Sequence, residues 1–302
     1  MMYDVIIVGG SFAGLAAAMQ LVRAQRKVLV IDSNLPRNRF ATASHGIFCL
    51  DGKTPAEIRK TALKQLLAYP TFEFWQDAVT AAEKQEDQFM VDTRQDMRAK
   101  AKRLILAFGI TDKLPELAGL QKYWGKNVVH CPYCHGYELR NTALGVLATS
   151  ELSMHQAAMI PDWGDTTLFT QGVYFPEPAF EIFLRGRNVN FEHSPVAAVN
   201  GNDEKMESVE LADGRIISLG GLYVGPKIQI TSPLVNQLGL SLSDAPLGKV
   251  VEVNELKESS VKGVYVAGDL SNPMQSGTLA IASGTMAGIS THQSLIFEGL
   301  GK

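Results

Sequence analysis

A glycine-rich turn between apolar segments near the N-terminus constrains the fold of this chain more than any other feature. Residues Tyr3–Val8 are rich in β-branched apolar side chains, which is typical of a strand buried in a parallel sheet. They are followed by the turn Gly9–Gly14 (GGSFAG), a helical pattern over Leu15–Ala24 and a second strand at Lys27–Ile31. This order of strand, glycine turn, helix and strand predicts a Rossmann βαβ unit.

The turn has the residues that a bound dinucleotide requires. Gly9 makes the tight turn, Gly14 allows close packing of helix on strand, and the helix N-terminus faces the pyrophosphate. Ser11 replaces the middle glycine of the usual pattern, and its hydroxyl can donate to a phosphate. Asp32 lies 23 residues after Gly9, where an acidic residue binds the ribose hydroxyls.

A second motif, CPYC at residues 131–134, indicates redox chemistry. Its two thiols are three positions apart, so they can close a small disulfide without large backbone movement, and Pro132 restricts the chain between them. A helix start favours the reactive thiolate. A zinc site would need two further ligands, and the histidines that flank the motif are too close to complete a tetrahedron. A CxxC motif in a chain with a βαβ pattern therefore predicts a redox-active dithiol and no metal.

Length and composition exclude several other classes. The 302 residues suggest about two domains. The 28 basic and 31 acidic residues nearly balance, which argues against nucleic acid as the main partner. No basic residue precedes the apolar N-terminal run, and glycines, Asp4 and Ser11 interrupt it, so neither a signal peptide nor a membrane span is expected. With only three cysteines, the chain is expected in a reducing cytoplasm.

Near the C-terminus, Gly263–Asp269 (GVYVAGD) is followed by Gln275 and an Ala/Gly-rich helix. Together with GGSFAG, Asp32 and CPYC, these motifs resemble the low-molecular-weight thioredoxin reductases over nearly the whole chain. The resemblance implies an α/β protein with two Rossmann-like, doubly wound domains. Residues 1–113 and 226–302 would form a split FAD domain, and residues 114–225 an inserted domain that carries the dithiol.

The resemblance also implies the flavin contacts. In that family the aspartate of GVYVAGD binds the ribityl–phosphate region of FAD, and the following glutamine and helix reach the flavin ring. The loop 34–52 passes along the flavin, which makes its histidine a candidate contact. The residues expected to bind FAD are Gly9, Ser11, Phe12, Ala13, Gly14, Asp32, Ser33, Arg39, His45, Gly109, Gly268, Asp269, Gln275 and Ser276.

The inserted domain departs from the family where NADPH would bind. Its first strand is expected at Ala143–Leu147 and its helix at Leu152–Ile160. The turn between them, Ala148–Glu151 (ATSE), stands where the family has a run of glycines. Side chains there obstruct the approach of a pyrophosphate, and the acidic residue adds charge of the wrong sign.

The second half of that nucleotide site is also missing. After the expected strand Thr166–Phe169 come residues 170–172 (TQG), where NADPH-dependent relatives have His-Arg-Arg for the 2′-phosphate. Arg185 and Arg187 fall too late, before a strand expected at Val189–Glu192, and are predicted to lie on the surface. We expect this domain to keep its fold without binding NADPH.

His135 directly follows the dithiol, where ordinary reductases have an aspartate. Imidazole titrates near neutrality, so it can serve as both acid and base in thiol–disulfide exchange. The alternative is a histidine that merely caps the helix. Glu138 is expected either to orient the imidazole or to be an ordinary surface carboxylate. By resemblance, Cys134 faces the flavin and Cys131 exchanges with the partner.

These observations predict an FAD-dependent thiol–disulfide oxidoreductase, a homodimer, that uses a donor other than NADPH, with ferredoxin a candidate. Its partner would be thioredoxin or a small dithiol or disulfide. One alternative is a dithiol oxidase that passes electrons to oxygen, as in gliotoxin or holomycin biosynthesis. Another is a flavin-binding protein without turnover.

Two further segments carry weaker expectations. Cys49 is interpreted as a small buried apolar residue. The basic run Arg98–Arg103 (RAKAKR) is expected to be a solvated hairpin face ahead of a strand at Leu104–Ala107, and a weak candidate for ferredoxin docking.

Overall fold

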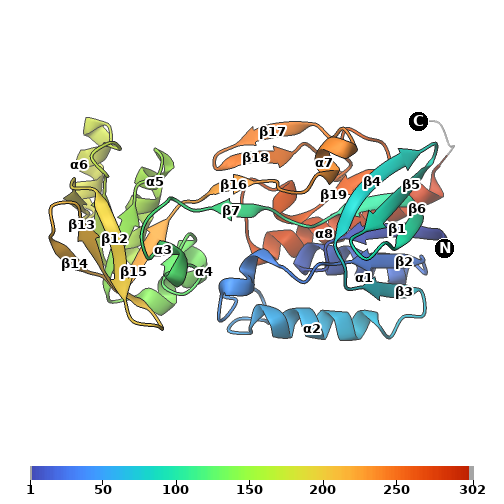
Figure 1. Cartoon of the computed structure of the whole chain (residues 1–302), viewed down its shortest axis with the longest axis horizontal. Helices are drawn as coiled ribbons and strands as arrows, with labels where there is room; N and C mark the ends of the chain where they lie inside the picture. Colours follow the sequence, from blue (N-terminus) through green and yellow to red (C-terminus); the bar gives the residue numbers. More distant parts are fainter. Residues whose placement is uncertain (1, 299–302) are drawn as a thin grey trace. The chain divides into compact units, whose positions relative to one another are not determined.

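The computed structural model describes residues 2–298, which form two compact units (Figure 1). The first unit comprises residues 2–39, 53–111 and 228–298, and the second Phe40–Gly52 and Asp112–Lys227. The segment Phe40–Gly52 therefore belongs to the dithiol-bearing unit, whereas the sequence placed it in the first domain. Both units contain parallel sheets covered by helices, which confirms the expected α/β class.

The first unit is built on a seven-stranded sheet in the order β3-β2-β1-β6-β5-β4, with β19 also paired to β6. Strands β1, β2, β3, β6 and β19 run parallel, and β4, β5 and β6 form an antiparallel meander. The central strands bury both faces, which accounts for their apolar character. The strands are β1 (Met2–Val8), β2 (Val28–Ile31), β3 (Phe72–Trp75), β4 (Val79–Gln85), β5 (Gln88–Thr93), β6 (Arg98–Leu106) and β19 (Val264–Val266).

A smaller sheet, β17-β18-β16-β7, contains the strands at which the chain passes between the units. Its strands are β7 (Thr111–Lys113), β16 (Lys227–Gln229), β17 (Leu242–Ala245) and β18 (Gly248–Val251). The helices of the first unit are α1 (Phe12–Arg23), α2 (Pro55–Leu66), α7 (Leu234–Gln237), η3 (Gly268–Leu270) and α8 (Gly277–Ile296), and η1 (Arg37–Phe40) ends at the first residue of the second unit.

Helices α1 and α8 pack with almost no space between their backbones. A Cβ atom added at Gly284 would lie 2.0 Å from the Ala13 carbonyl oxygen, and one at Gly288 would lie 2.6 Å from that of Ala17. The small residues of both helices belong to one core cluster on the sheet. The Ala/Gly-rich composition of α8 thus reflects close helix–helix packing.

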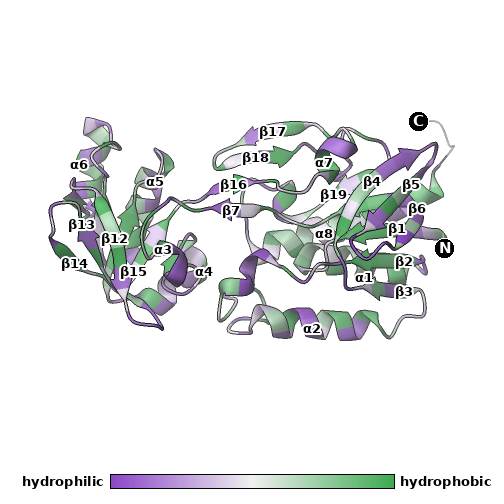
Figure 2. Cartoon of the chain, viewed as in Figure 1, coloured by the Kyte–Doolittle hydropathy of each residue, from purple (hydrophilic) through white to green (hydrophobic). Residues whose placement is uncertain are grey.

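Helix α2 is stabilised by local contacts at its N-terminus. A capping box starts it, in which Thr54 accepts from the Glu57 backbone and the Glu57 carboxylate accepts from the Thr54 backbone. The helix is amphipathic, and Figure 2 shows both hydrophilic and hydrophobic residues along it. No helix in residues 2–298 combines the length and apolar character that crossing a bilayer requires.

The second unit contains a five-stranded parallel sheet, β11-β10-β9-β15-β8, and a three-stranded antiparallel sheet, β12-β13-β14. Two core clusters lie against these sheets. The strands are β8 (Val128–Val129), β9 (Ala143–Leu147), β10 (Asp165–Phe169), β11 (Asn190–Glu192), β12 (Val196–Gly201), β13 (Met206–Leu211), β14 (Ile216–Ser218) and β15 (Gly221–Val224). The helices are α3 (Leu120–Tyr123), α4 (Pro132–Leu139), α5 (Leu152–Met159), η2 (Ile160–Asp162) and α6 (Pro178–Gly186).

The expected strands and helices are present, with one notable difference at the basic run Arg98–Arg103. This run is the first part of β6 rather than a segment ahead of it. Its side chains alternate between solvent and core, and Ala99, Ala101 and Arg103 point inward. Because charged residues alternate with apolar ones here, a search for continuous apolar runs does not detect this part of the strand.

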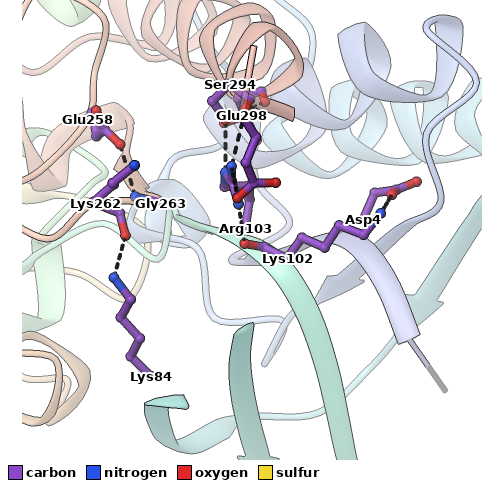
Figure 3. A network of polar contacts seen from close by, with 10 residues as sticks. Asp4, Lys84, Lys102, Arg103, Glu258, Lys262, Gly263, Ser294 and Glu298 are labelled. Atoms are coloured by element: carbon purple, nitrogen blue, oxygen red, sulfur yellow. Dashed lines mark hydrogen bonds and ion pairs between the residues drawn. The ribbon is translucent and has the colours of Figure 1, made fainter. Parts of the chain in front are cut away.

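Arg103 is buried beneath the C-terminal end of α8 (Figure 3). Its guanidinium donates to the Ser294 hydroxyl at 3.0 Å and to the Ser294 carbonyl at 3.2 Å, and pairs with Glu298 at 2.9 Å. A cation is favourable where the last carbonyls of a helix lack partners. These contacts link the C-terminal end of α8 to strand β6 of the sheet.

We predict that Gly284→Ala destabilises the first unit, because the new methyl group must displace the backbone of α1. Overpacking of this kind costs about 1–3 kcal/mol, so the thermal unfolding midpoint should fall by roughly 5–10 °C. Circular dichroism would measure it. Gly186→Ala in α6 is the control, since a Cβ there would contact nothing within 4 Å. An unchanged midpoint for Gly284→Ala would contradict the packing described here.

Candidate active site

The turn between β1 and α1 forms a cradle made of backbone. Gly9 has a φ of +108°, and a Cβ there would lie 2.4 Å from the Ala107 carbonyl oxygen. A Cβ on Gly14 would lie 1.8 Å from the Gly9 oxygen. Ser11 is the N-cap of α1, but its side chain does not cap the helix, and the first turn contains no acidic residue. The N–H groups at this helix start are therefore suited to an anion.

Asp32 lies at the end of β2, beside this turn, and is buried. One carboxylate oxygen accepts from the Gly10 N–H at 2.9 Å, and the other accepts from the Asn34 N–H at 3.1 Å. Arg59 of α2 forms an ion pair with Asp32 and donates through Nε to the Gly10 carbonyl at 2.8 Å. The sequence analysis missed Arg59, because no local motif marks a side chain that reaches the turn from a separate helix.

The second acidic candidate, Asp269, lies in η3 directly after β19. Gly268 before it has a φ of +73° and donates its N–H to the Ser283 hydroxyl of α8 at 3.1 Å. Asp269 accepts from Arg37 at 3.0 Å. Arg39, the arginine selected from the sequence, is exposed and donates to the Pro36 carbonyl, and Arg37 had not been selected.

The remaining candidates of the first unit vary in their surroundings. Ser276 caps α8 by accepting from the Leu279 N–H, and Gln275 donates to the Pro273 carbonyl at 3.0 Å. Ser33 is exposed. Phe12 and Ala13 lie in the first turn of α1, and Gly109 has a left-handed φ of +74° after β6.

His45 is the candidate from the segment Phe40–Gly52. It lies in the second unit, where its Nδ1 is 3.6 Å from a carboxylate oxygen of Glu138 and 3.6 Å from one of Asp51. Cys49, in the same segment, is exposed and has a φ of +64°, so its assignment as a buried apolar residue was wrong. The segment is a surface loop with a tight turn, and such loops bury few side chains.

The dithiol lies at the start of helix α4, as the sequence predicted. Cys131 is the N-cap, Pro132 occupies the first helical position, and Cys134 lies in the first turn. Both cysteines are half-buried. The helix start directs backbone N–H groups toward the motif, which stabilises a thiolate there.

His135 directly follows the dithiol, and one of its ring nitrogens makes no hydrogen bond to the described residues. Burial lowers the pKa of His135, a hydrogen bond to the Cys131 backbone and the charge of Glu138 partly oppose this, and His45 lowers it further. Its Nδ1 is buried without a hydrogen-bond partner among the described residues. The imidazole is therefore neutral at neutral pH and can exchange a proton.

Tyr223 of β15 also has a buried polar atom that lacks a hydrogen-bond partner among the described residues. Its side chain is fully buried, and its hydroxyl also finds no partner within residues 2–298. Burial raises the pKa of Tyr223, with smaller contributions from Cys131 and Glu138. Buried polar atoms without partners are costly, and two of them near one dithiol suggest a functional reason. Sequence reasoning missed Tyr223, because an aromatic residue in an apolar strand resembles ordinary core.

The βα turn of the second unit is filled by its own side chains. The Thr149 N–H donates to the Ser153 hydroxyl at 3.0 Å, and the Thr149 hydroxyl donates to the Gly225 carbonyl at 2.7 Å. Ala148 is buried. The groups that would cradle a pyrophosphate in a glycine-rich turn are here engaged in internal hydrogen bonds.

The turn after β10 is partly engaged in the same way, although Gln171 Nε2 is buried there without a hydrogen-bond partner among the described residues. The Thr170 hydroxyl is buried 3.0 Å from the His193 ring, and the Gln171 side chain accepts from the Val196 N–H at 3.1 Å. As expected, Arg185 is exposed and pairs with a residue of its own helix. Arg187 is half-buried rather than solvated, because its Nε donates to the Ala158 carbonyl.

Comparison with known proteins places these features in a family. Residues 3–159 match the pyridine nucleotide-disulphide oxidoreductase family. The chain belongs to this family. It is 31% identical to a thioredoxin reductase, tcpT, of Claviceps purpurea, over 94% of this chain and 92% of that protein.

Solved structures agree with this assignment. An oxidoreductase from Agrobacterium tumefaciens is 43% identical, with a TM-score of 0.95, and the match covers 99% of this chain and 100% of that one. The protein HlmI is 28% identical, with a TM-score of 0.91 and coverage of 99% and 94%. The chain is accordingly a thioredoxin reductase-like, FAD-dependent disulfide oxidoreductase.

The first unit fits FAD on its own geometry. The uncapped start of α1 suits a pyrophosphate, and the glycine positions leave room that side chains would fill. Asp32 supplies the carboxylate that ribose hydroxyls require. Among residues 2–298, no cluster of three or more His, Cys, Asp or Glu side chains could hold a metal ion.

We predict that His135 titrates below its ordinary pKa of 6.5, because burial disfavours the imidazolium. A lowered folded-state pKa contributes stability that is present above pH 6.5 and is lost as pH falls through the folded value. NMR titration of the imidazole signals would measure the pKa, with His135→Asn used to assign the resonance. Titration above 6.5 would show that Glu138 outweighs burial.

Proposed function

We propose that this protein moves electrons between FAD and a dithiol or disulfide partner through Cys131 and Cys134, using a donor other than NADPH. The observation that carries the proposal is the internal bonding of both nucleotide turns in the second unit. At the positions where the cofactor would bind, Thr149 and Gln171 form hydrogen bonds to other groups of the protein. Ferredoxin is the donor we favour by resemblance to the pyridine nucleotide-independent reductases.

The proposed exchange with a disulfide partner proceeds in two steps. The Cys131 thiolate attacks one partner sulfur, which forms a mixed disulfide and releases the other partner sulfur as a thiolate. Cys134 then attacks the Cys131 sulfur, which closes the enzyme disulfide and releases the second partner thiolate. The partner gains two electrons and two protons. Restoring the enzyme dithiol takes an electron pair, which is the chemistry that bound FAD supplies.

His135 is the proposed acid and base for these steps. Its pKa is lowered by burial, so the neutral ring can take the proton of an attacking thiol. The resulting imidazolium can protonate the leaving thiolate. Glu138 opposes the lowering and lies beside His45, so it would stabilise the imidazolium when it forms.

The runner-up is an oxygen-using dithiol oxidase. Tyr133 and Tyr137 favour it, since they lie one turn apart on α4 and are 74% and 66% exposed. These rings offer an aromatic surface beside the dithiol that suits a small substrate, whereas thioredoxin is the partner expected for the reductase. A flavin-binding protein without turnover is disfavoured by the CxxC motif, which lies at a helix start beside an acid–base group. We also propose a cytoplasmic homodimer on the family resemblance.

We predict that neither NADPH nor NADH reduces the bound flavin, because the backbone and side chains that would hold their phosphates are engaged. Anaerobic titration followed at the flavin absorbance would test this. Reduction by a dithiol serves as the control for a competent flavin. Rapid bleaching by stoichiometric NADPH would refute the proposal.

The same assay separates the two candidate functions. Reduction by ferredoxin followed by reduction of thioredoxin supports the reductase. Sustained oxygen consumption with a small dithiol as the only reductant supports the oxidase.

We predict that His135→Asn slows electron transfer from a dithiol by about two to four orders of magnitude, because general acid–base catalysis is lost. The pH dependence of the rate between pH 6 and 9 should flatten, as stopped-flow reduction would show. Cys131→Ser and Cys134→Ser define complete loss and should retain FAD. An unchanged rate and pH profile would reduce His135 to a helix cap.

A further inference from the structure

The guanidinium of Arg59 connects three parts of the nucleotide cradle. It pairs with the Asp32 carboxylate, donates through Nε to the Gly10 carbonyl at 2.8 Å, and donates through Nη1 to the Asn34 side chain. Its charged end is also 5.8 Å from the centre of the Phe74 ring. The Arg59 side chain is only 18% exposed and that of Asp32 only 11%.

The hydrogen bonds of Asp32 limit how it can meet a ligand. An ionised carboxylate has about four acceptor positions. Both the Asn34 N–H and Arg59 use Oδ2, whereas only the Gly10 N–H, among the residues that the structure describes, uses Oδ1. The oxygen Oδ1 therefore keeps one acceptor position for an incoming hydroxyl, and Arg59 prevents the carboxylate from rotating away.

The charge of Arg59 matters as well. A buried carboxylate next to a pyrophosphate is an unfavourable pair of like charges, and burial strengthens the repulsion. A guanidinium bonded to that carboxylate offsets its charge. It also holds the Gly10 carbonyl, whose lone pairs would otherwise add to the negative field at the turn.

We propose that Arg59 is a positioning residue for the adenosine diphosphate half of FAD. It acts through Asp32, by orienting the carboxylate for a ribose hydroxyl and by neutralising its charge beside the pyrophosphate. This role is independent of the electron donor and of the dithiol chemistry.

The test measures FAD binding to full-length protein stripped of its flavin. Arg59→Met should weaken FAD binding by about 10- to 100-fold, the range for hydrogen bonds to charged groups. ADP, titrated in competition, should lose affinity by the same factor, because it contains only the half that Arg59 serves. Arg59→Lys should recover part of the loss, since lysine keeps the positive charge but lacks the planar guanidinium with its several fixed hydrogen-bond donors.

A double-mutant cycle with Asp32→Asn separates positioning from mere stability. If Arg59 acts through Asp32, the double variant should bind FAD no more weakly than Asp32→Asn alone. Lys60→Met is the matched control on the same helix, since Lys60 is exposed and should leave FAD affinity unchanged. The melting temperature of each flavin-free variant identifies any general loss of fold.

Three results would overturn the proposal. One is wild-type affinity for FAD in Arg59→Met. Another is a double variant whose loss of FAD affinity equals the product of the fold-losses of the two single variants, which would mean that Arg59 and Asp32 act independently. The third is a loss for FAD without a loss for ADP, which would place the action of Arg59 elsewhere on the cofactor.

Discussion

The close approach of backbone to backbone around helix α1 supports the whole nucleotide-binding unit. On one side, Gly9 and Gly14 bring the helix start against the sheet, and on the other Gly284 and Gly288 bring α8 against it. Any side chain at three of these glycines would meet a backbone oxygen within 2.5 Å, and at Gly288 one would meet it at 2.6 Å. The cradle for the cofactor is thus a consequence of how tightly α1 packs against both the sheet and α8.

The second unit uses a related framework for a different purpose. Its strands β9 and β10 lead into turns as in a nucleotide-binding domain, but Thr149 and Gln171 bond within the protein. A turn whose polar groups are satisfied internally gains nothing by binding a phosphate, since each new hydrogen bond would replace an existing one. Among the described residues of this unit, the buried side-chain atoms without hydrogen-bond partners are His135 Nδ1 and the Tyr223 hydroxyl near the dithiol, and Gln171 Nε2 in the turn after β10.

Charge in the cradle is balanced pair by pair. Asp32 is paired with Arg59, and Asp269 with Arg37, so both acidic residues suited to a flavin dinucleotide are accompanied by a guanidinium. In a partly buried site, an isolated carboxylate would repel a pyrophosphate. Pairing keeps the carboxylates oriented while removing most of the repulsion.

The sequence by itself determined the local motifs: the glycine turn, the strand that ends in Asp32, the dithiol at a helix start and the altered turn at Thr149. Each of these depends on a few consecutive residues whose spacing matches one backbone conformation. Only the tertiary structure decided which side chains meet across long separations, such as Arg59 with Asp32 and His45 with Glu138. Such contacts depend on how helices and loops pack, and no local pattern encodes that packing.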